Sequence, residues 1–180
     1  MNKKLERKVI LLFCAGIIAL LIIAIIPKNA VTISNAVVNE NNGDIAFCYF
    51  YPTKFGILNV DLYSKDGDKL FSQTFKAGGG YGALRFYNDK LYVSYGKTDK
   101  KTCVIDRSGN VSDTDIPSEI ISTADTFKGW SSVRGKKTYS LDGYTYIYEM
   151  PTVFHRRAEL TISNTVTSKT VYNSDNFNDK

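Results

Sequence analysis

The stretch "LYVSYGKTDKKTCVIDRSGNV", residues 91–111, decides how the rest of the chain is interpreted. It contains two short runs of alternating or apolar residues, a lysine-rich loop between them, and a Ser-Gly turn near its end. Beyond Pro27 the same texture continues, with Tyr, Phe, Val, Ile and Thr clustered in runs of five to eight residues. Turn residues separate these runs about every ten positions, which predicts an all-β domain.

Tight hairpin turns are marked by short polar segments along the chain. Asp-Gly, Asn-Gly and Ser-Gly pairs supply the positive φ that two-residue β-turns require. The segments are "NNGD" at 41–44, "KDGD" at 65–68, "YND" at 87–89, "RSGN" at 107–110 and "LDG" at 141–143.

Aligning these turns reveals a repeat of four strands. The second strand of each unit is predicted to begin at Ile45, Leu91 and Tyr144, at spacings of 46 and 53 residues. The turn after the third strand is then reached at Gly67, Gly109 and Asn164. The sequence therefore predicts three antiparallel meander units, near residues 36–75, 83–116 and 136–173.

The repeat resembles the blades of bacterial β-propellers. The segments "NDKLYV" and "VIDRSGNV" resemble the second strand and the third-strand turn of a blade, and four-stranded blades recur about every 40–50 residues. No Gly-His or Trp-Asp signature marks a unit. Propellers close with about 4 to 8 blades, so three units imply open ends. A β-sandwich with evenly spaced turns and a remnant of a longer propeller are the alternatives.

An apolar run near the amino terminus predicts a membrane anchor. Residues 9–26, "VILLFCAGIIALLIIAII", carry no charge over 18 positions. A spanning helix needs about 20 apolar residues, whereas a signal-peptide core has about 7 to 15. We therefore expect a single-pass protein with a cytoplasmic basic tail at 1–8, a transmembrane helix at 9–26 in the lipid bilayer, and an extracellular β domain at 27–180. The orientation follows from the basic residues before the run; a cleaved signal is the alternative.

Much of the chain's net positive charge lies before the apolar run, where it predicts the orientation in the membrane. Residues 1–26 hold four Lys/Arg and one Glu, which leaves 19 basic and 17 acidic residues in the remainder. A nearly balanced ectodomain gives no reason to expect a nucleic-acid partner. Lysine greatly exceeds arginine, and asparagine and isoleucine are plentiful, which is typical of an AT-rich bacterial genome.

No motif in the chain predicts catalysis, a cofactor or a metal. The glycine-rich segment 76–84 leads into a predicted strand rather than a helix, unlike a phosphate loop. The single histidine, His155, lies between strands beside two arginines. Basic residues in loops are candidate contacts for an anionic polymer or a partner: Lys97, Lys100, Lys101, His155, Arg156 and Arg157.

Two cysteines lie in apolar, strand-like runs of the β domain. Cys48 is within "IAFCYFY" and Cys103 within "TCVI". Both are predicted to be buried, because their neighbours are apolar on both sides. An exported pair forms disulfides, whereas buried free thiols act as small hydrophobic side chains; the sequence leaves both alternatives open.

These features favour a non-catalytic surface protein whose β domain binds an envelope protein or a cell-wall polymer. Open ends that leave an apolar face or an unpaired edge exposed would also favour a homo-oligomer. The competing hypothesis is an envelope hydrolase in which the fold brings carboxylates together. Scattered acids available for that role include Asp61, Asp106 and Asp142.

Overall fold

The described part of the chain is built from antiparallel β-strands. The computed structural model describes residues 31–50, 56–78, 82–96, 100–114, 127–152 and 157–177. Within them the chain forms thirteen strands in three sheets and a 3₁₀-helix, η2 (Ser174–Phe177). The prediction of an antiparallel all-β domain is confirmed. The predicted membrane helix at 9–26 lies outside the described residues, within which no helix is long and apolar enough to cross a bilayer.

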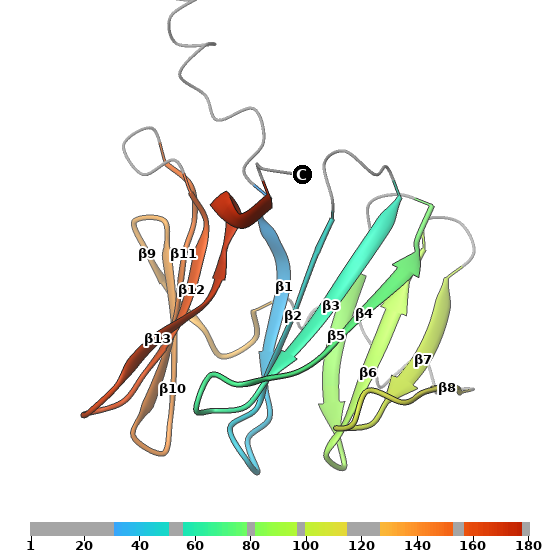
Figure 1. The fold of residues 1–180 in the computed structure, drawn as a ribbon, viewed down its shortest axis with the longest axis horizontal. Coiled ribbons are helices and arrows are strands. Elements are labelled where there is room, and N and C mark those ends of the chain that lie inside the picture. Colours follow the sequence, from blue (N-terminus) through green and yellow to red (C-terminus); the bar gives the residue numbers. More distant parts are fainter. Residues whose placement is uncertain are drawn as a thin grey trace, which may run out of the picture.

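Each sheet is a meander in which strands adjacent in sequence are adjacent in space (Figure 1). The first sheet contains β1 (Ile33–Val38), β2 (Ile45–Phe50), β3 (Ile57–Tyr63) and β4 (Lys69–Lys76). The second contains β5 (Gly82–Tyr87), β6 (Lys90–Tyr95), β7 (Lys101–Ile105) and β8 (Val111–Asp113). The third contains β9 (Ser131–Val133), β10 (Lys136–Leu141), β11 (Tyr144–Glu149), β12 (Glu159–Ser163) and β13 (Ser168–Asn173).

Turn residues end the strands at equivalent places in different sheets. The β5–β6 hairpin turns on Asn88 and Asp89, with φ of 48° and 60°, and the β10–β11 hairpin on Asp142 and Gly143, with φ of 49° and 81°. Two successive residues of positive φ are the geometry of the two-residue hairpin turn whose twist matches that of the strands. Asn, Asp and Gly tolerate that conformation best, which explains why these segments turn.

The turns that follow the third strands of the first two sheets share one hydrogen-bond pattern. Ser64 N donates to Asp68 O at 2.9 Å in the first sheet, and Asp106 N donates to Asn110 O at 3.1 Å in the second. The glycine amide then donates back to the same first residue at 2.9 Å in both turns. "SKDGD" and "DRSGN" therefore fold alike, although only their glycine is shared.

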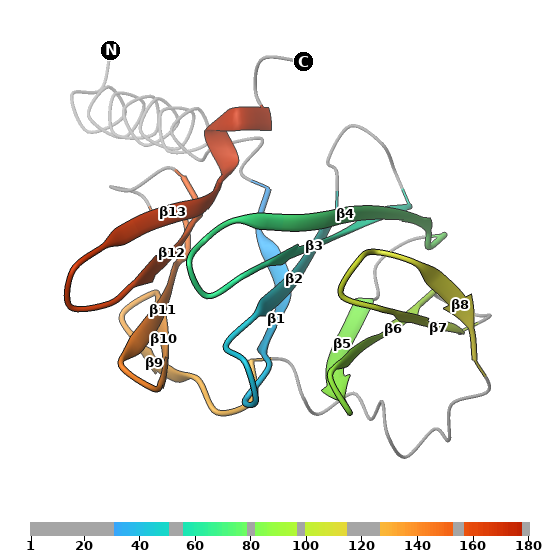
Figure 2. The same ribbon diagram turned by 60° about the horizontal axis from the view of Figure 1, so that its bottom comes forward.

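The three sheets stack side by side in the order third, first, second (Figures 1 and 2). One apolar cluster joins the first sheet to the third, and includes Phe47 and Tyr148. A separate cluster joins the first sheet to the second, and includes Val60 and Ile105. The first sheet is therefore buried on both faces, which accounts for the apolar residues on both faces of β2. This arrangement of three sheets differs from the two packed sheets of the sandwich alternative.

Both cysteines of the β domain lie in the cluster between the first and second sheets. Cys48 is 0% exposed and Cys103 2% exposed, and both are free thiols. Their predicted burial is confirmed, and the two cysteines do not form a disulfide with each other. Burial raises the pKa of Cys48 to about 12 and that of Cys103 to about 11. Both therefore act as neutral, apolar side chains at physiological pH.

The contact between neighbouring sheets recurs with the same parts. A Cβ added to Gly67, in the β3–β4 turn, would lie 2.7 Å from Lys169 of β13 in the third sheet. A Cβ added to Gly109, in the equivalent β7–β8 turn, would lie 2.9 Å from Phe71 of β4 in the first sheet. In each case a glycine turn packs under the last strand of the sheet beside it.

A second contact recurs in the same turns, one or two residues before the glycine. Asp66 of the β3–β4 turn accepts a hydrogen bond from Tyr144 Oη at 3.1 Å, and Lys65 lies over the Tyr144 ring. Arg107 of the β7–β8 turn donates to Asp44, which directly precedes β2. Tyr144 is the first residue of β11, the second strand of its predicted unit, and so lies near the same place as Asp44 does beside β2. The second sheet thus contacts the first much as the first contacts the third.

Replacing Gly109 by alanine should weaken the docking of the second sheet on the first. At φ +87° a side chain is strained, and its Cβ would meet Phe71. Gly109→Ala is expected to lower the free energy of unfolding by about 3 kcal/mol, from backbone strain and overpacking together. The matched control is Gly143→Ala, at φ +81° with no atom within 4 Å of the added Cβ, which should lose only about 1 kcal/mol.

The measurement is urea unfolding of the full-length protein in detergent, followed by the fluorescence of its single tryptophan. Trp130 packs against the cluster between the first and third sheets. Equal losses in the two variants would show that the glycine is needed only for its backbone conformation and not for the packing contact.

Candidate functional site

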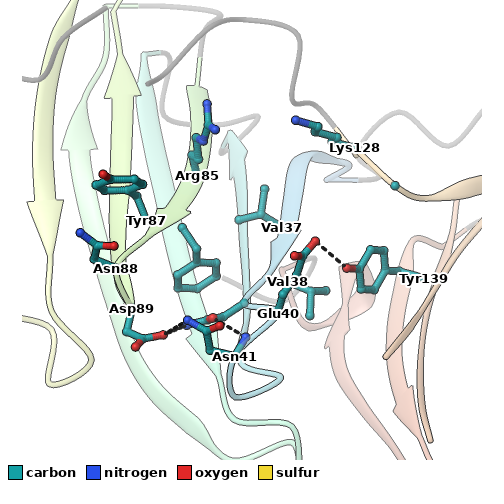
Figure 3. Close-up of a pocket in the computed structure, with 13 residues that line it drawn as sticks. Val37, Val38, Glu40, Asn41, Arg85, Tyr87, Asn88, Asp89, Lys128 and Tyr139 are labelled. Atoms are coloured by element: carbon teal, nitrogen blue, oxygen red, sulfur yellow. Dashed lines mark hydrogen bonds between the residues drawn. The ribbon is translucent and has the colours of Figure 1, made fainter. Parts of the chain in front are cut away.

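A cavity of about 500 Å³ lies where the three sheets meet (Figure 3). The first sheet contributes the end of β1 and the turn after it, the second contributes the β5–β6 hairpin, and the third contributes β10 and the segment before β9. The lining residues among those described are Val37, Val38, Asn39, Glu40, Asn41, Arg85, Phe86, Tyr87, Asn88, Asp89, Lys128, Gly129 and Tyr139.

The turn between β1 and β2, residues 39–44, forms one wall of the cavity, and we name it the hub turn. Asn39 N donates to Asp44 O and Gly43 N donates to Asn39 O, both at 2.8 Å. The Asn39 side chain also accepts the amide of Asn41 at 3.0 Å. Gly43 has φ +77°, a backbone conformation that glycine adopts without steric cost. The sequence "NENNGD" therefore closes a turn through its own backbone and side-chain hydrogen bonds.

Three side chains of the hub turn bind the second sheet. The side-chain amides of Asn39 and Asn41 donate to Asp89 Oδ1 at 3.1 and 2.9 Å. The Arg107 guanidinium donates to both carboxylate oxygens of buried Asp44, at 2.7 and 3.2 Å. This fork-like pairing raises the pKa of Arg107 and is the strong form of an ion pair.

Two other groups of the hub turn bind the third sheet. Tyr146 Oη donates to Gly43 O at 2.5 Å, and Tyr139 Oη donates to Glu40 Oε1 at 3.4 Å. Burial raises the pKa of both phenols, with the charge of Glu40 adding to the effect at Tyr139. Both tyrosines are therefore neutral hydrogen-bond donors, and the hub turn is tied to all three sheets.

Charged groups of both signs line the cavity. Hydrogen bonds from Asn41 and Asn39 lower the pKa of Asp89, so that it is a carboxylate at neutral pH. Within the described residues these bonds use only its Oδ1. Figure 3 places Arg85 and Lys128 at the end of the cavity opposite Asp89 and Asn41, with Glu40 toward Tyr139. The site can hold a polar ligand by charge and by hydrogen bonds at once.

The basic residues selected from the sequence lie away from this cavity wherever the structure describes them. Lys101 opens β7, and Lys100 precedes it, in the second sheet. Arg157, beside the third sheet, pairs with Glu159 at 2.9 Å and lies 3.8 Å from Asp175. The first sheet separates these two groups (Figure 1). The other three, Lys97, His155 and Arg156, lie outside the described residues.

The three scattered acids each occupy a different sheet. Asp61 of β3 is buried and accepts hydrogen bonds from Ser72 at 2.5 Å and Lys69 at 3.1 Å. Asp106 accepts the amides of its own turn, and its pKa is lowered chiefly by Asn110. Asp142 forms the β10–β11 turn. None of the three lines the cavity, and the part of the chain that is described brings no three His, Cys, Asp or Glu residues together as metal ligands.

The sequence predicts two turns that line the cavity, but it does not predict that they meet. It selected "NNGD" and "YND" as turns, yet Asn41 and Asp89 of those turns also bond to each other across two sheets. Comparison of the chain with models of known protein families and with curated proteins finds no match. The properties of the site therefore rest on its own residues.

Removing Asn41's amide should raise the pKa of Asp89. In the native protein that carboxyl group is expected to titrate below its ordinary value of 3.8, because Asn41 and Asn39 stabilise the charged form. These bonds are present above that value and are lost as the pH falls through the lowered pKa. Asn41→Ala should move the titration midpoint upward, measured from the carboxyl ¹³C chemical shift of Asp89.

The matched control is Asn110→Ala, which removes the equivalent amide from Asp106. This variant should raise the pKa of Asp106 and leave the pKa of Asp89 unchanged. If native Asp89 titrates at or above 3.8, the cross-sheet bonds do not form in solution.

Proposed function

We propose that the protein is a non-catalytic, single-pass membrane protein that binds an envelope protein or cell-wall polymer through its β domain. Residues 9–26 are the anchor, residues 1–8 are cytoplasmic, and the domain at 27–180 is extracellular. The observation that carries the proposal is the cavity at the junction of the three sheets, lined by polar groups from all of them. Its volume is within the range of about 300–1,000 Å³ typical of ligand sites.

We further propose that the three units, near 36–75, 83–116 and 136–173, are blade-like repeats arranged as an open arc. The recurring glycine-turn contacts of Gly67 and Gly109 support this arrangement. So does the pairing of neighbouring sheets, because the same face of each unit meets the opposite face of the unit before it. A relation that repeats without two-fold symmetry is a heterologous interface, the type from which rings are built.

The position of the cavity suits a binding site directed away from a membrane. The described chain begins at Val31, where Tyr172 Oη donates to the Val31 carbonyl and Tyr148 Oη accepts the Ile33 amide. β1 then runs for six residues, roughly 20 Å at about 3.3 Å per residue, before it reaches the hub turn. The chain therefore enters β1 at the end opposite the hub turn (Figure 1).

The electrostatics of the cavity favour binding over the hydrolase alternative. A general acid needs a carboxyl group whose pKa is raised, so that it holds a proton at neutral pH. The pKa of Asp89 is shifted in the opposite direction by its amide donors. An ionised carboxylate that lines the cavity is instead suited to accept hydrogen bonds from a bound ligand.

The anchor is tested by protease treatment of intact cells. Proteolysis should remove the β domain and leave a short membrane-bound fragment that contains residues 1–26. Lysed cells provide the control for total protein. β domain recovered free in the medium, with a new amino terminus near residue 31 or 37, would instead identify a cleaved signal.

The binding site is tested by photo-crosslinking in the native cell, which captures a ligand of any identity. Tyr87 lines the cavity and is 46% exposed, so a photoreactive residue there should be tolerated and should form a defined adduct. The same residue at Val133, which is 67% exposed on the third sheet and outside the cavity, is the control. Equal labelling at the two positions, or no adduct at position 87, would contradict the proposal.

A further inference from the structure

The three sheets stack head to tail, so that each contact joins the same two kinds of face. In each sheet one residue pair precedes the turn between the second and third of its four equivalent strands and the last: Ile45 with Tyr63, Leu91 with Ile105, and Thr145 with Ser163. We call the face that carries this pair the front and the opposite face the back. The front of the second sheet packs on the back of the first, which carries Ala46, and the front of the first packs on the back of the third, which carries Tyr146.

This order leaves the back of the second sheet without another sheet against it among the described residues. It lies at the end of the stack beyond the first sheet (Figure 1). Lys90 and Tyr92 of β6, Val104 of β7 and Ser112 of β8 share this face, since Tyr92 pairs with Val104 and Val104 with Ser112. Lys90 and Ser112 are exposed, and the other two are half-buried. We name these four residues the open face.

Each covered back face receives a glycine turn from the sheet that covers it. A Cβ added to Gly109 would lie 2.9 Å from the Cβ of Phe71, and one added to Gly67 would lie 3.3 Å from the Cβ of Lys169. Ser112 is at the same register position in the last strand of the second sheet. Because the contact is with a Cβ, which serine also has, a turn that covers Ser112 in the same way needs a glycine.

The residue two positions before that glycine contacts the residue that corresponds to Lys90. Arg107 forms an ion pair with Asp44, and Lys65 Nζ lies 5.5 Å from the centre of the Tyr144 ring. Asp44, Lys90 and Tyr144 each directly precede the front-face residue that begins the equivalent register. At Lys90 a third cation would be repelled, whereas a carboxylate at that position of the turn would be attracted.

Tyr92 corresponds to Tyr146, since each lies two residues after the residue just compared. The Tyr146 hydroxyl donates to the carbonyl of Gly43, in the turn between the first two strands of the covering sheet. The open face therefore carries the same hydroxyl donor at the same place.

A second copy of this chain does not offer the matching surface. The fronts of its first and second sheets are buried within the chain, which leaves the front of the third. The turn on that sheet is closed by Asn164 N donating to Thr167 O at 2.9 Å, and residues 164–167 include neither a glycine nor an acid. The partner that fits is therefore a sheet of different sequence.

We infer that the open face binds a β-meander sheet of another protein, whose turn after its third strand carries Asp or Glu two residues before a glycine. The glycine packs against Ser112, the carboxylate pairs with Lys90, and Tyr92 donates to the turn between the partner's first two strands. This surface rests on the proposed blade-like arrangement and is separate from the cavity, which none of the four residues lines.

The chemistry of the open face is tested by duplicating residues 77–114 directly after Thr114 in the full-length protein. Docking of the added sheet should bury its Cys103, as the original Cys103 is buried against the first sheet. The rate of maleimide labelling in detergent, in a Cys14→Ser background, reports that burial, and the unduplicated protein gives the baseline. Arg107→Glu in the added copy should label about fivefold more slowly than the same duplication with Arg107 kept, because its charge attracts Lys90.

Charge reversal at the original Lys90 is the control for folding of the added sheet. Lys90→Glu should reverse the order, so that the copy with Arg107 is the better protected. Rapid labelling of all four duplications would show that the open face accepts no sheet and would overturn the inference. Equal protection in all four would overturn the assignment of an acidic turn.

The partner itself is tested by a photoreactive residue at Ser112 in the native cell, with Val133 on the third sheet as the control position. The adduct should contain a peptide of another protein with Asp or Glu two residues before a glycine. An adduct with a second copy of this chain, with a glycan or with a peptide lacking that pattern would overturn the inference, as would no adduct. An adduct at position 87 with none at position 112 would overturn it and leave the proposed binding at the cavity standing.

Discussion

The structure depends most on the hub turn, six residues that hold three sheets together. Asp44 is buried, so its charge must be neutralised within the protein, and Arg107 of the second sheet does so. One residue earlier, the Gly43 carbonyl accepts the Tyr146 hydroxyl of the third sheet. Leaving a buried carboxylate unpaired costs several kcal/mol. The turn therefore ties both outer sheets to the first sheet through buried polar groups.

The third sheet leaves a polar face uncovered. On the third sheet, residues of β11 and β12 alternate between the buried cluster, with Tyr146, Tyr148 and Leu160, and the outer face. That outer face carries Thr145, Thr161 and Ser163 opposite one another, with Ile147 among them. Polar outer faces are how terminal units of a repeat array remain soluble. At this end hydroxyl groups therefore predominate on the outer face of β11 and β12.

Local chemistry made the class of fold and its turns predictable, and long-range pairing made the site unpredictable. Strand alternation and Asn/Asp-Gly turns depend on neighbours in sequence, and they placed the starts of β2 and β11 at Ile45 and Tyr144. The start of β6 is one residue earlier than expected, at Lys90. The apolar residues on both faces of β2 indicated burial, but they could not indicate which sheets would cover it. Asn41 and Asp89 were recognisable only as turn formers, because the bond between them joins residues 48 positions apart. Arg157 looked available for an anion until Glu159 was placed beside it.

The same bonds that hold the sheets together also prepare the cavity for a ligand. Asn39, Asn41 and Asp89 are fixed by one another across the sheets, so binding at this end requires little further ordering of side chains. Ordering a flexible side chain on binding costs about 0.5–1.5 kcal/mol, and a site that is already ordered avoids that cost. The hydrogen bonds that assemble the fold therefore also shape the cavity through which we propose that the protein binds.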